Sequence, residues 1–149
     1  MAYGRYFEEL EVGQQFQHWP GRTIQDYDDT LLSLLSMNQH PIHHDAYYAQ
    51  GGQHGRRLVA GPVVISLAIG MSQADVGGRA SATRRYLDVR HESPAFHGDT
   101  IYAESRVLDK KLISMDRGEV EIETCARKQS GESVLSMRRI LVVPLKGGS

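Results

Sequence analysis

The spacing of hydrophobic residues changes about halfway along the chain, from a helical repeat to the alternation that is typical of strands. In the first half, one run has apolar residues every three or four positions: Ile24, Tyr27, Leu31 and Leu34 or Leu35. Residues 23–26, Thr-Ile-Gln-Asp, have the form of a capping box with Asp in place of the commoner Glu. We therefore expect an amphipathic helix over 24–37. Pro41 cannot extend it, so a polar loop should follow over 38–45.

A second helix is predicted to begin at Gly61-Pro62, because proline suits the first turn of a helix. Residues 63–71 leave almost no polar face, and a helix that is apolar all round is usually buried. The run is rich enough in β-branched residues that a strand is the alternative.

The second half alternates between apolar and polar residues, which predicts strands with one buried and one wet face. The alternation is clearest over 101–107 and 120–125, and residues 80–91 and 134–143 suggest two further strands. Gly98-Asp99 and Gly118 can supply turns between them. One buried helix against a long antiparallel sheet is an α+β arrangement.

The composition fits one domain over residues 1–149, because this length is typical of a single packed core. The formal net charge of -1 argues against a nucleic-acid partner. Cys125 is the only cysteine, so the chain has no internal disulfide. The start of the chain is too acidic for a signal peptide, and residues 58–69 are too short to span a bilayer. We expect a cytoplasmic protein with no membrane partner.

Residues 38–45, Asn-Gln-His-Pro-Ile-His-His-Asp, hold the densest group of chemically active side chains. Histidine titrates near neutral pH, so this segment could transfer protons. A solvated loop with surface histidines is one alternative. A zinc site is another, although the three histidines lack a regular ligand spacing and no second cysteine helps.

Four segments together resemble the MaoC-like dehydratase/hydratase family. They are residues 6–13 at the start, 38–45 in the loop, 59–62 before the second helix and 93–100 before a strand. The nearest branch is the mesaconyl-CoA hydratase and methylmalyl-CoA dehydratase type. The resemblance implies a single hot-dog fold over 1–149, with a long central helix wrapped by an antiparallel sheet. It also implies a pantetheine tunnel at the interface of a homodimer or a higher homo-oligomer.

The resemblance assigns the acid/base role to His43. The family has an aspartate five residues earlier, where this chain has Asn38, and asparagine cannot take up a proton as a base. We expect Asn38 to orient the water or the substrate oxygen. His40 stands where the family has asparagine, and we predict that it binds substrate. Asp45 matches a position that is usually structural.

Charge that develops on the thioester oxygen needs a donor, and backbone amides at a buried helix start can supply it. Gly61 is the better donor, since Pro62 has no amide hydrogen. The alternative is that Gly61 and Pro62 only interrupt the preceding secondary structure. Arginines at 56–57, 84–85 and 90 are candidates for the phosphates of coenzyme A, with a solvated surface as the alternative.

These residues predict a hydro-lyase that adds water reversibly across a 2-enoyl thioester, carried by coenzyme A or by an acyl carrier protein. We expect no metal and no cofactor, apart from the coenzyme A or phosphopantetheine of the substrate. A hot-dog thioesterase and a non-catalytic acyl-thioester binding module are the alternatives. The acyl group and the physiological direction stay open.

Overall fold

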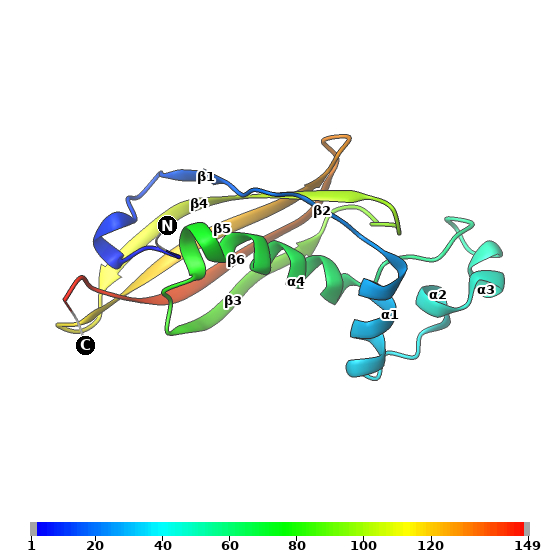
Figure 1. The fold of residues 1–149 in the computed structure, drawn as a ribbon, viewed down its shortest axis with the longest axis horizontal. Helices are drawn as coiled ribbons and strands as arrows, with labels where there is room; N and C mark the ends of the chain where they lie inside the picture. The colour runs from blue at the N-terminus through cyan, green and yellow to red at the C-terminus, as the bar shows by residue number, and fades with distance from the viewer. Residues whose placement is uncertain (1–2, 148–149) are drawn as a thin grey trace.

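The computed structural model describes residues 3–147. Its helices and strands follow the order expected of the two halves (Figure 1). The first half holds η1 (Phe7–Glu9), β1 (Gln15–Gln17), β2 (Arg22–Thr23), α1 (Asp26–Leu35), α2 (Pro41–His44), α3 (Ala46–Gln50), α4 (Gly61–Ser72) and η2 (Gln73–Gly77). The second half holds β3 (Ala82–His91), β4 (Thr100–Leu112), β5 (Arg117–Lys128) and β6 (Ser133–Pro144).

All strands belong to one antiparallel sheet with the order β1-β4-β5-β6-β3, and β2 also pairs with β4. The long strands β4, β5 and β6 pair along most of their lengths, and β3 forms one edge. The alternation predicted for β4 is confirmed, because Ile101, Ala103, Ser105 and Val107 are all buried. The four strands expected in the second half are therefore confirmed.

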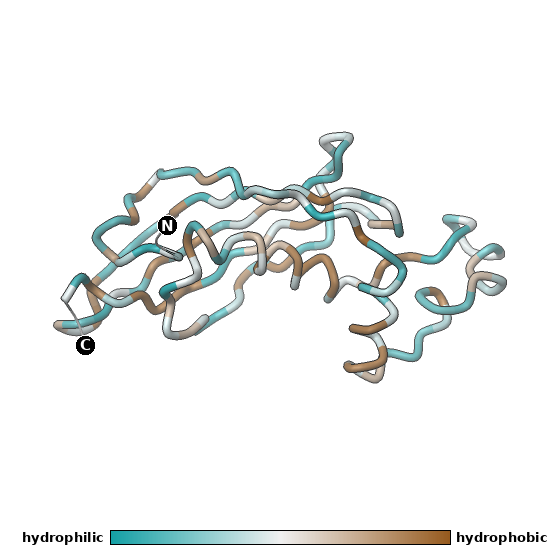
Figure 2. Tube along the Cα trace, viewed as in Figure 1, coloured by the Kyte–Doolittle hydropathy of each residue, from teal (hydrophilic) through white to brown (hydrophobic). Residues whose placement is uncertain are grey.

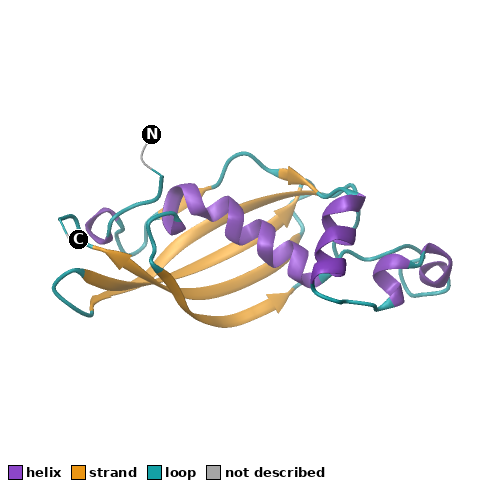
Figure 3. Cartoon of the chain, turned by 60° about the horizontal axis from the view of Figure 1, so that its bottom comes forward, coloured by secondary structure: helices purple, strands orange, loops and turns teal. Residues whose placement is uncertain are grey.

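Helix α4 lies across the inner face of the sheet (Figure 3). Val63, Val64 and Ala68 are buried, and they pack with sheet residues such as Ile101 and Leu135 in one hydrophobic cluster. Burying this apolar surface is the main stabilising contribution to such a layered fold. The prediction of a buried helix beginning at Gly61 is thus confirmed, and so is the α+β hot-dog fold, in which the sheet wraps a central helix.

Helix α1 exists where it was predicted, but its cap and its buried face differ from the expectation. The N-cap is Gln25, whose N–H donates to the Asp28 carboxylate at 2.8 Å, so the cap lies two residues later than predicted. The helix buries Asp29 and Ser33, each 1% exposed. The apolar residues of the predicted face within α1, which are Tyr27, Leu31, Leu34 and Leu35, are exposed instead. Figure 2 shows this hydrophobic helix between the sheet and the projecting segment.

Gly118 was predicted to form a turn, which is wrong, because it lies inside β5. A Cβ at this position would overlap the Phe7 ring, so the glycine lets that ring pack against the strand. The turn between β4 and β5 lies at 113–116 instead. The other predicted turn is confirmed, since Gly98 has a positive φ of 91° immediately before β4.

Candidate functional site

The segment 38–45 does not form an open loop as predicted, because Pro41 begins the short helix α2. Pro41 needs no hydrogen-bond acceptor in the first turn of a helix. His40 is the N-cap, and its Nδ1 accepts a hydrogen bond from the N–H of Ile42 at 3.3 Å. Asp45 caps α3 in turn by accepting the N–H of Tyr48 at 2.9 Å. Together with residues 51–57, α2 and α3 project beyond the end of the sheet (Figure 1).

His43 is held in one orientation by the chain that leads into α4. Its Nδ1 lies 2.8 Å from the carbonyl oxygen of Leu58, and the imidazole is half-buried. A carbonyl can only accept a hydrogen bond, so Nδ1 must carry the hydrogen. In the neutral ring, Nε2 therefore keeps a lone pair that can take up a proton. This arrangement is what a general base requires.

Asn38 contacts His40 and His44, and no hydrogen bond joins its side chain to that of His43 among the described residues. Its Oδ1 accepts the N–H of His40 at 3.1 Å, and its backbone carbonyl accepts from Nε2 of His44 at 2.8 Å. The side-chain oxygen is thus occupied by the loop itself. The Nδ2 hydrogens remain as donors toward an oxygen atom.

Gly61 is the first residue of α4, so its N–H has no acceptor within the helix. A Cβ at this position would lie 2.7 Å from Nε2 of His91, which is at the end of β3. Because Gly61 has no side chain, the His91 ring can approach its backbone closely. Both residues line a cavity of about 330 Å³ beside Val134. The structure thus brings an exposed imidazole to the start of α4, which the sequence did not indicate.

A buried carboxylate that the sequence analysis missed holds the segment between His43 and Gly61. Asp29 accepts the N–H of Ala60 and Nε2 of His97, both at 3.0 Å. Asp29 belongs to α1, Ala60 precedes α4, and His97 lies in the turn before β4. The only local signal was a polar residue within an amphipathic helix. Its partner His97 is 68 residues away in the sequence.

A second polar chain lies inside the molecule, near the other end of α4. Hydrogen bonds of 2.7–3.3 Å connect its members in the order Asp75, His18, Ser105, Thr124, Arg139 and Ser72. The first three have the Asp-His-Ser order of a nucleophilic triad. However, Ser105 is only 3% exposed and its hydroxyl already contacts both neighbours. Burial lowers the pKa of the Arg139 guanidinium. This chain joins η2 and α4 to the sheet.

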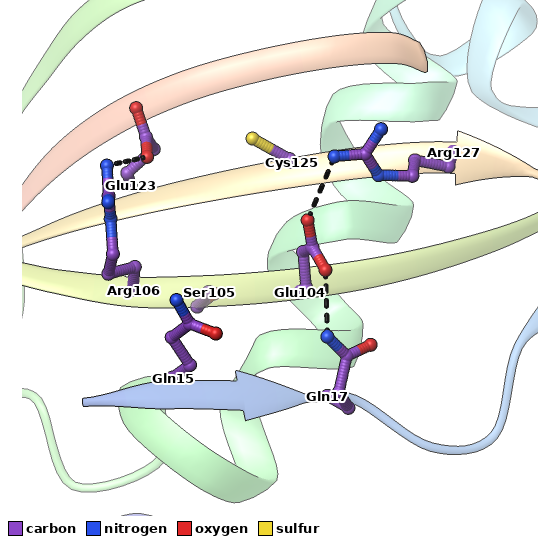
Figure 4. Close-up of a pocket in the computed structure, with 8 residues that line it drawn as sticks. All are labelled: Gln15, Gln17, Glu104, Ser105, Arg106, Glu123, Cys125 and Arg127. Carbon is purple, nitrogen blue, oxygen red and sulfur yellow. Dashed lines mark hydrogen bonds and ion pairs between the residues drawn. The ribbon is translucent and has the colours of Figure 1, made fainter. Parts of the chain in front are cut away.

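The outer face of the sheet carries a shallow cavity of about 220 Å³ around Cys125 (Figure 4). Glu104 and Arg127 form one ion pair beside it, and Arg106 and Glu123 form another. Burial raises the pKa of the Cys125 thiol, and the neighbouring glutamates add to this effect. The charges on this face largely cancel, and the thiol is poorly suited to act as a nucleophile.

Within residues 3–147, no three His, Cys, Asp or Glu side chains are grouped so that they could hold a metal ion. No helix of that part of the chain is long and apolar enough to cross a bilayer. Independence from metals and cofactors stays a prediction.

Residues 8–128 match the family model of the MaoC like domain. The chain is 33% identical over 124 residues to beta-methylmalyl-CoA dehydratase of Chloroflexus aurantiacus, covering 82% of this chain and 35% of that protein. It is 30% identical to mesaconyl-CoA hydratase of Cereibacter sphaeroides, covering 94% of this chain and 41% of that protein. The chain thus spans well under half the length of these relatives.

The fold is similar to the solved structure of a monoamine oxidase regulatory protein from Archaeoglobus fulgius. The TM-score is 0.85 at 26% identity, and the match covers 95% of each chain. This match supports the hot-dog fold of the chain.

Proposed function

The chain belongs to the family of MaoC-like domains, and on this premise we propose that it is a hydro-lyase acting on an acyl thioester. The reaction is the reversible addition of water across a 2-enoyl thioester to give the 3-hydroxyacyl thioester. One observation carries the proposal: the Leu58 carbonyl holds Nδ1 of His43 and leaves Nε2 free to accept a proton. The names of the relatives, a CoA dehydratase and a CoA hydratase, support the reaction class.

In the dehydration direction, Nε2 of His43 removes the proton from the carbon beside the thioester carbonyl. The negative charge develops on the carbonyl oxygen, toward which the N–H of Gly61 is the donor. The bond between the neighbouring carbon and its hydroxyl group then breaks, and the hydroxide leaves as water with the proton from His43. Asn38 orients the leaving oxygen through Nδ2, since its Oδ1 is engaged by His40. Hydration is the reverse of these steps.

Replacing His43 tests the proposal directly. His43→Ala should reduce hydration of crotonyl-CoA or mesaconyl-CoA on the order of 10²–10⁴-fold, as expected for loss of a general acid/base. Cys125→Ser, on the outer face of the sheet, is the control and should keep its activity. Equal activity in the wild type and in His43→Ala would remove His43 from the mechanism.

Replacing Asn38 separates the proposal from its alternatives. Asn38→Ala should lose less than His43→Ala, because orientation rather than a proton acceptor is removed. Asn38→Asp should retain or raise activity on a straight-chain enoyl thioester if the chain is a hydratase. Release of free thiol without hydration would indicate a thioesterase. Tight binding of thioesters with no turnover of any enoyl or hydroxyacyl thioester would indicate a binding module.

We further propose that the protein acts as a homodimer or a higher homo-oligomer. In the single chain, Leu31, Leu34 and Leu35 on α1 are 56%, 71% and 75% exposed, and β3 is an edge strand. Apolar patches and strand edges of this kind are usually covered. A second copy of the chain can cover both. A stable monomer at micromolar concentration in light scattering would contradict this assembly.

The cytoplasm remains our expectation for the location of the protein.

A further inference from the structure

A cavity of about 230 Å³ lies between α3 and the loop 51–57, in the part that projects beyond the sheet. Its wall combines two residues of α3, three of the loop and two that precede β4: Ala46, Gln50, Gly55, Arg56, Arg57, Phe96 and His97. The loop leads into Leu58, whose carbonyl holds His43. The loop that lines the cavity therefore leads directly to the residue that orients His43.

The Arg56 guanidinium is held in place at this cavity without a carboxylate partner. Its Cζ lies 3.6 Å from the centroid of the buried Phe96 ring, which is the geometry of a cation–π contact. Among residues 3–147, the ion pairs include Arg57 with Asp26 at 2.5 Å but none with Arg56. The Arg56 side chain is exposed, so its hydrogen-bond donors can reach a ligand.

Among the basic side chains that line this cavity, only Arg56 lacks a carboxylate partner within residues 3–147. Arg57 pairs with Asp26, and His97 lies 3.0 Å from the Asp29 carboxylate. In the cavity on the outer face, both arginines have a carboxylate partner, since Arg127 pairs with Glu104 and Arg106 with Glu123 (Figure 4). A pre-oriented guanidinium without a carboxylate partner suits an anion, and its fork of donors matches phosphate in particular.

We propose that this cavity binds a phosphate group on the carrier arm of the thioester, with Arg56 as its principal contact. The inference rests on the proposed function, since it concerns the same substrate. Two carriers offer this chemistry: the phosphates of coenzyme A, and the phosphodiester of a phosphopantetheine arm on a carrier protein. In both carriers the phosphate lies at the far end of the pantetheine arm from the acyl group. Helix α3, which lines the cavity, likewise lies apart from the start of α4 (Figure 1).

The test compares crotonyl thioesters that differ only in their phosphates: crotonyl-CoA, crotonyl-dephospho-CoA, crotonyl-phosphopantetheine and crotonyl-pantetheine. Arg56→Gln keeps a planar group over Phe96 and removes the charge. It should raise KM for crotonyl-CoA about tenfold or more, as loss of a charge-assisted hydrogen bond predicts. KM for crotonyl-pantetheine should not change, and kcat should change little for either substrate. An equal effect on both thioesters would overturn the proposal.

The other two thioesters distinguish the sources of the phosphate. Sensitivity to Arg56→Gln that persists with crotonyl-phosphopantetheine assigns the cavity to the phosphate next to pantetheine, which both carriers share. Sensitivity that is confined to crotonyl-CoA assigns it to the phosphate that dephospho-CoA lacks, and thus to coenzyme A alone. Arg106→Ala, an arginine on the outer face of the sheet, is the matched control and should leave all four KM values unchanged.

Equilibrium binding of coenzyme A itself separates this inference from the proposed function. If the wild type hydrates no thioester, the proposed function fails, but coenzyme A should still bind more weakly to Arg56→Gln than to the wild type. Binding of coenzyme A that is equal in the two proteins, with the same thermal unfolding curve, would overturn the phosphate site. A steeper loss of wild-type binding with added salt is also expected.

Discussion

Replacing Asp29 by alanine should lower the free energy of unfolding by about 2–6 kcal/mol, because two groups lose the acceptor of a hydrogen bond and an unsatisfied buried group costs about 1–3 kcal/mol. The carboxylate is 1% exposed and accepts hydrogen bonds from Ala60 and His97, both at 3.0 Å. Its removal leaves the buried N–H of Ala60 without an acceptor, which by itself costs about 1–3 kcal/mol. Loss of the contact with His97 accounts for the rest.

Urea unfolding at one fixed protein concentration measures this change, because assembly would otherwise shift the midpoint. The matched control is Asp26→Ala, on the same helix. Its carboxylate pairs with Arg57 but is 70% exposed, so its removal should cost less than about 1 kcal/mol. Asp29→Asn should lie between the two, since its amide oxygen can still accept the N–H of Ala60.

A double-mutant cycle of Asp29→Ala and His97→Ala isolates the contact between the two side chains. Residues in direct contact usually show a coupling energy of about 0.5–3 kcal/mol. The reasoning would be refuted if Asp29→Ala cost no more than Asp26→Ala, or if the cycle showed no coupling. Either result would mean that the segment before α4 is held without the buried carboxylate.

Three further outcomes follow from individual contacts. The raised pKa of the Cys125 thiol keeps it protonated at neutral pH. An aromatic disulfide should therefore react with this thiol more slowly in the folded protein than in urea, and the rate in the folded protein should increase with pH. Equal rates in the folded and the unfolded protein would contradict this. Gly61→Ala should displace the His91 ring into the adjoining cavity and reduce the rate of thioester hydration. The free energy of unfolding should change by less than about 1 kcal/mol. The double variant with His91→Ala should regain the hydration activity. Leu35→Lys should weaken dimer formation about tenfold or more in sedimentation experiments, whereas Met115→Lys, 99% exposed on the hairpin between β4 and β5, should leave it unchanged.

Local patterns were enough to predict the main elements of the fold. The alternation along β4 and β5 is a property of neighbouring residues, and it correctly placed Ile101 and Val107 on the buried face. The apolar run after Gly61 likewise correctly predicted the central helix. The motif over 38–45 identified the segment that carries His43, although whether His43 and Asn38 act in catalysis stays a prediction.

The hydrophobic pattern failed where burial depends on what a residue meets across the fold. Periodicity predicted helix α1, but the segment before α4 and the turn before β4 contact the side that carries Asp29, whereas Leu35 is exposed in the single chain. Gly118 has the composition of a turn, yet it serves the packing of Phe7 from the start of the chain.

The arrangement of the site was decided only by the tertiary structure. The Leu58 carbonyl that fixes the tautomer of His43 lies 15 residues further along the chain, and His97 lies 68 residues from Asp29. A local pattern carries no information about such pairs, because the chain between them determines whether they meet. The residues of 38–45 indicate where protons could be transferred. The path of the folded backbone determines which nitrogen of His43 is free to accept one.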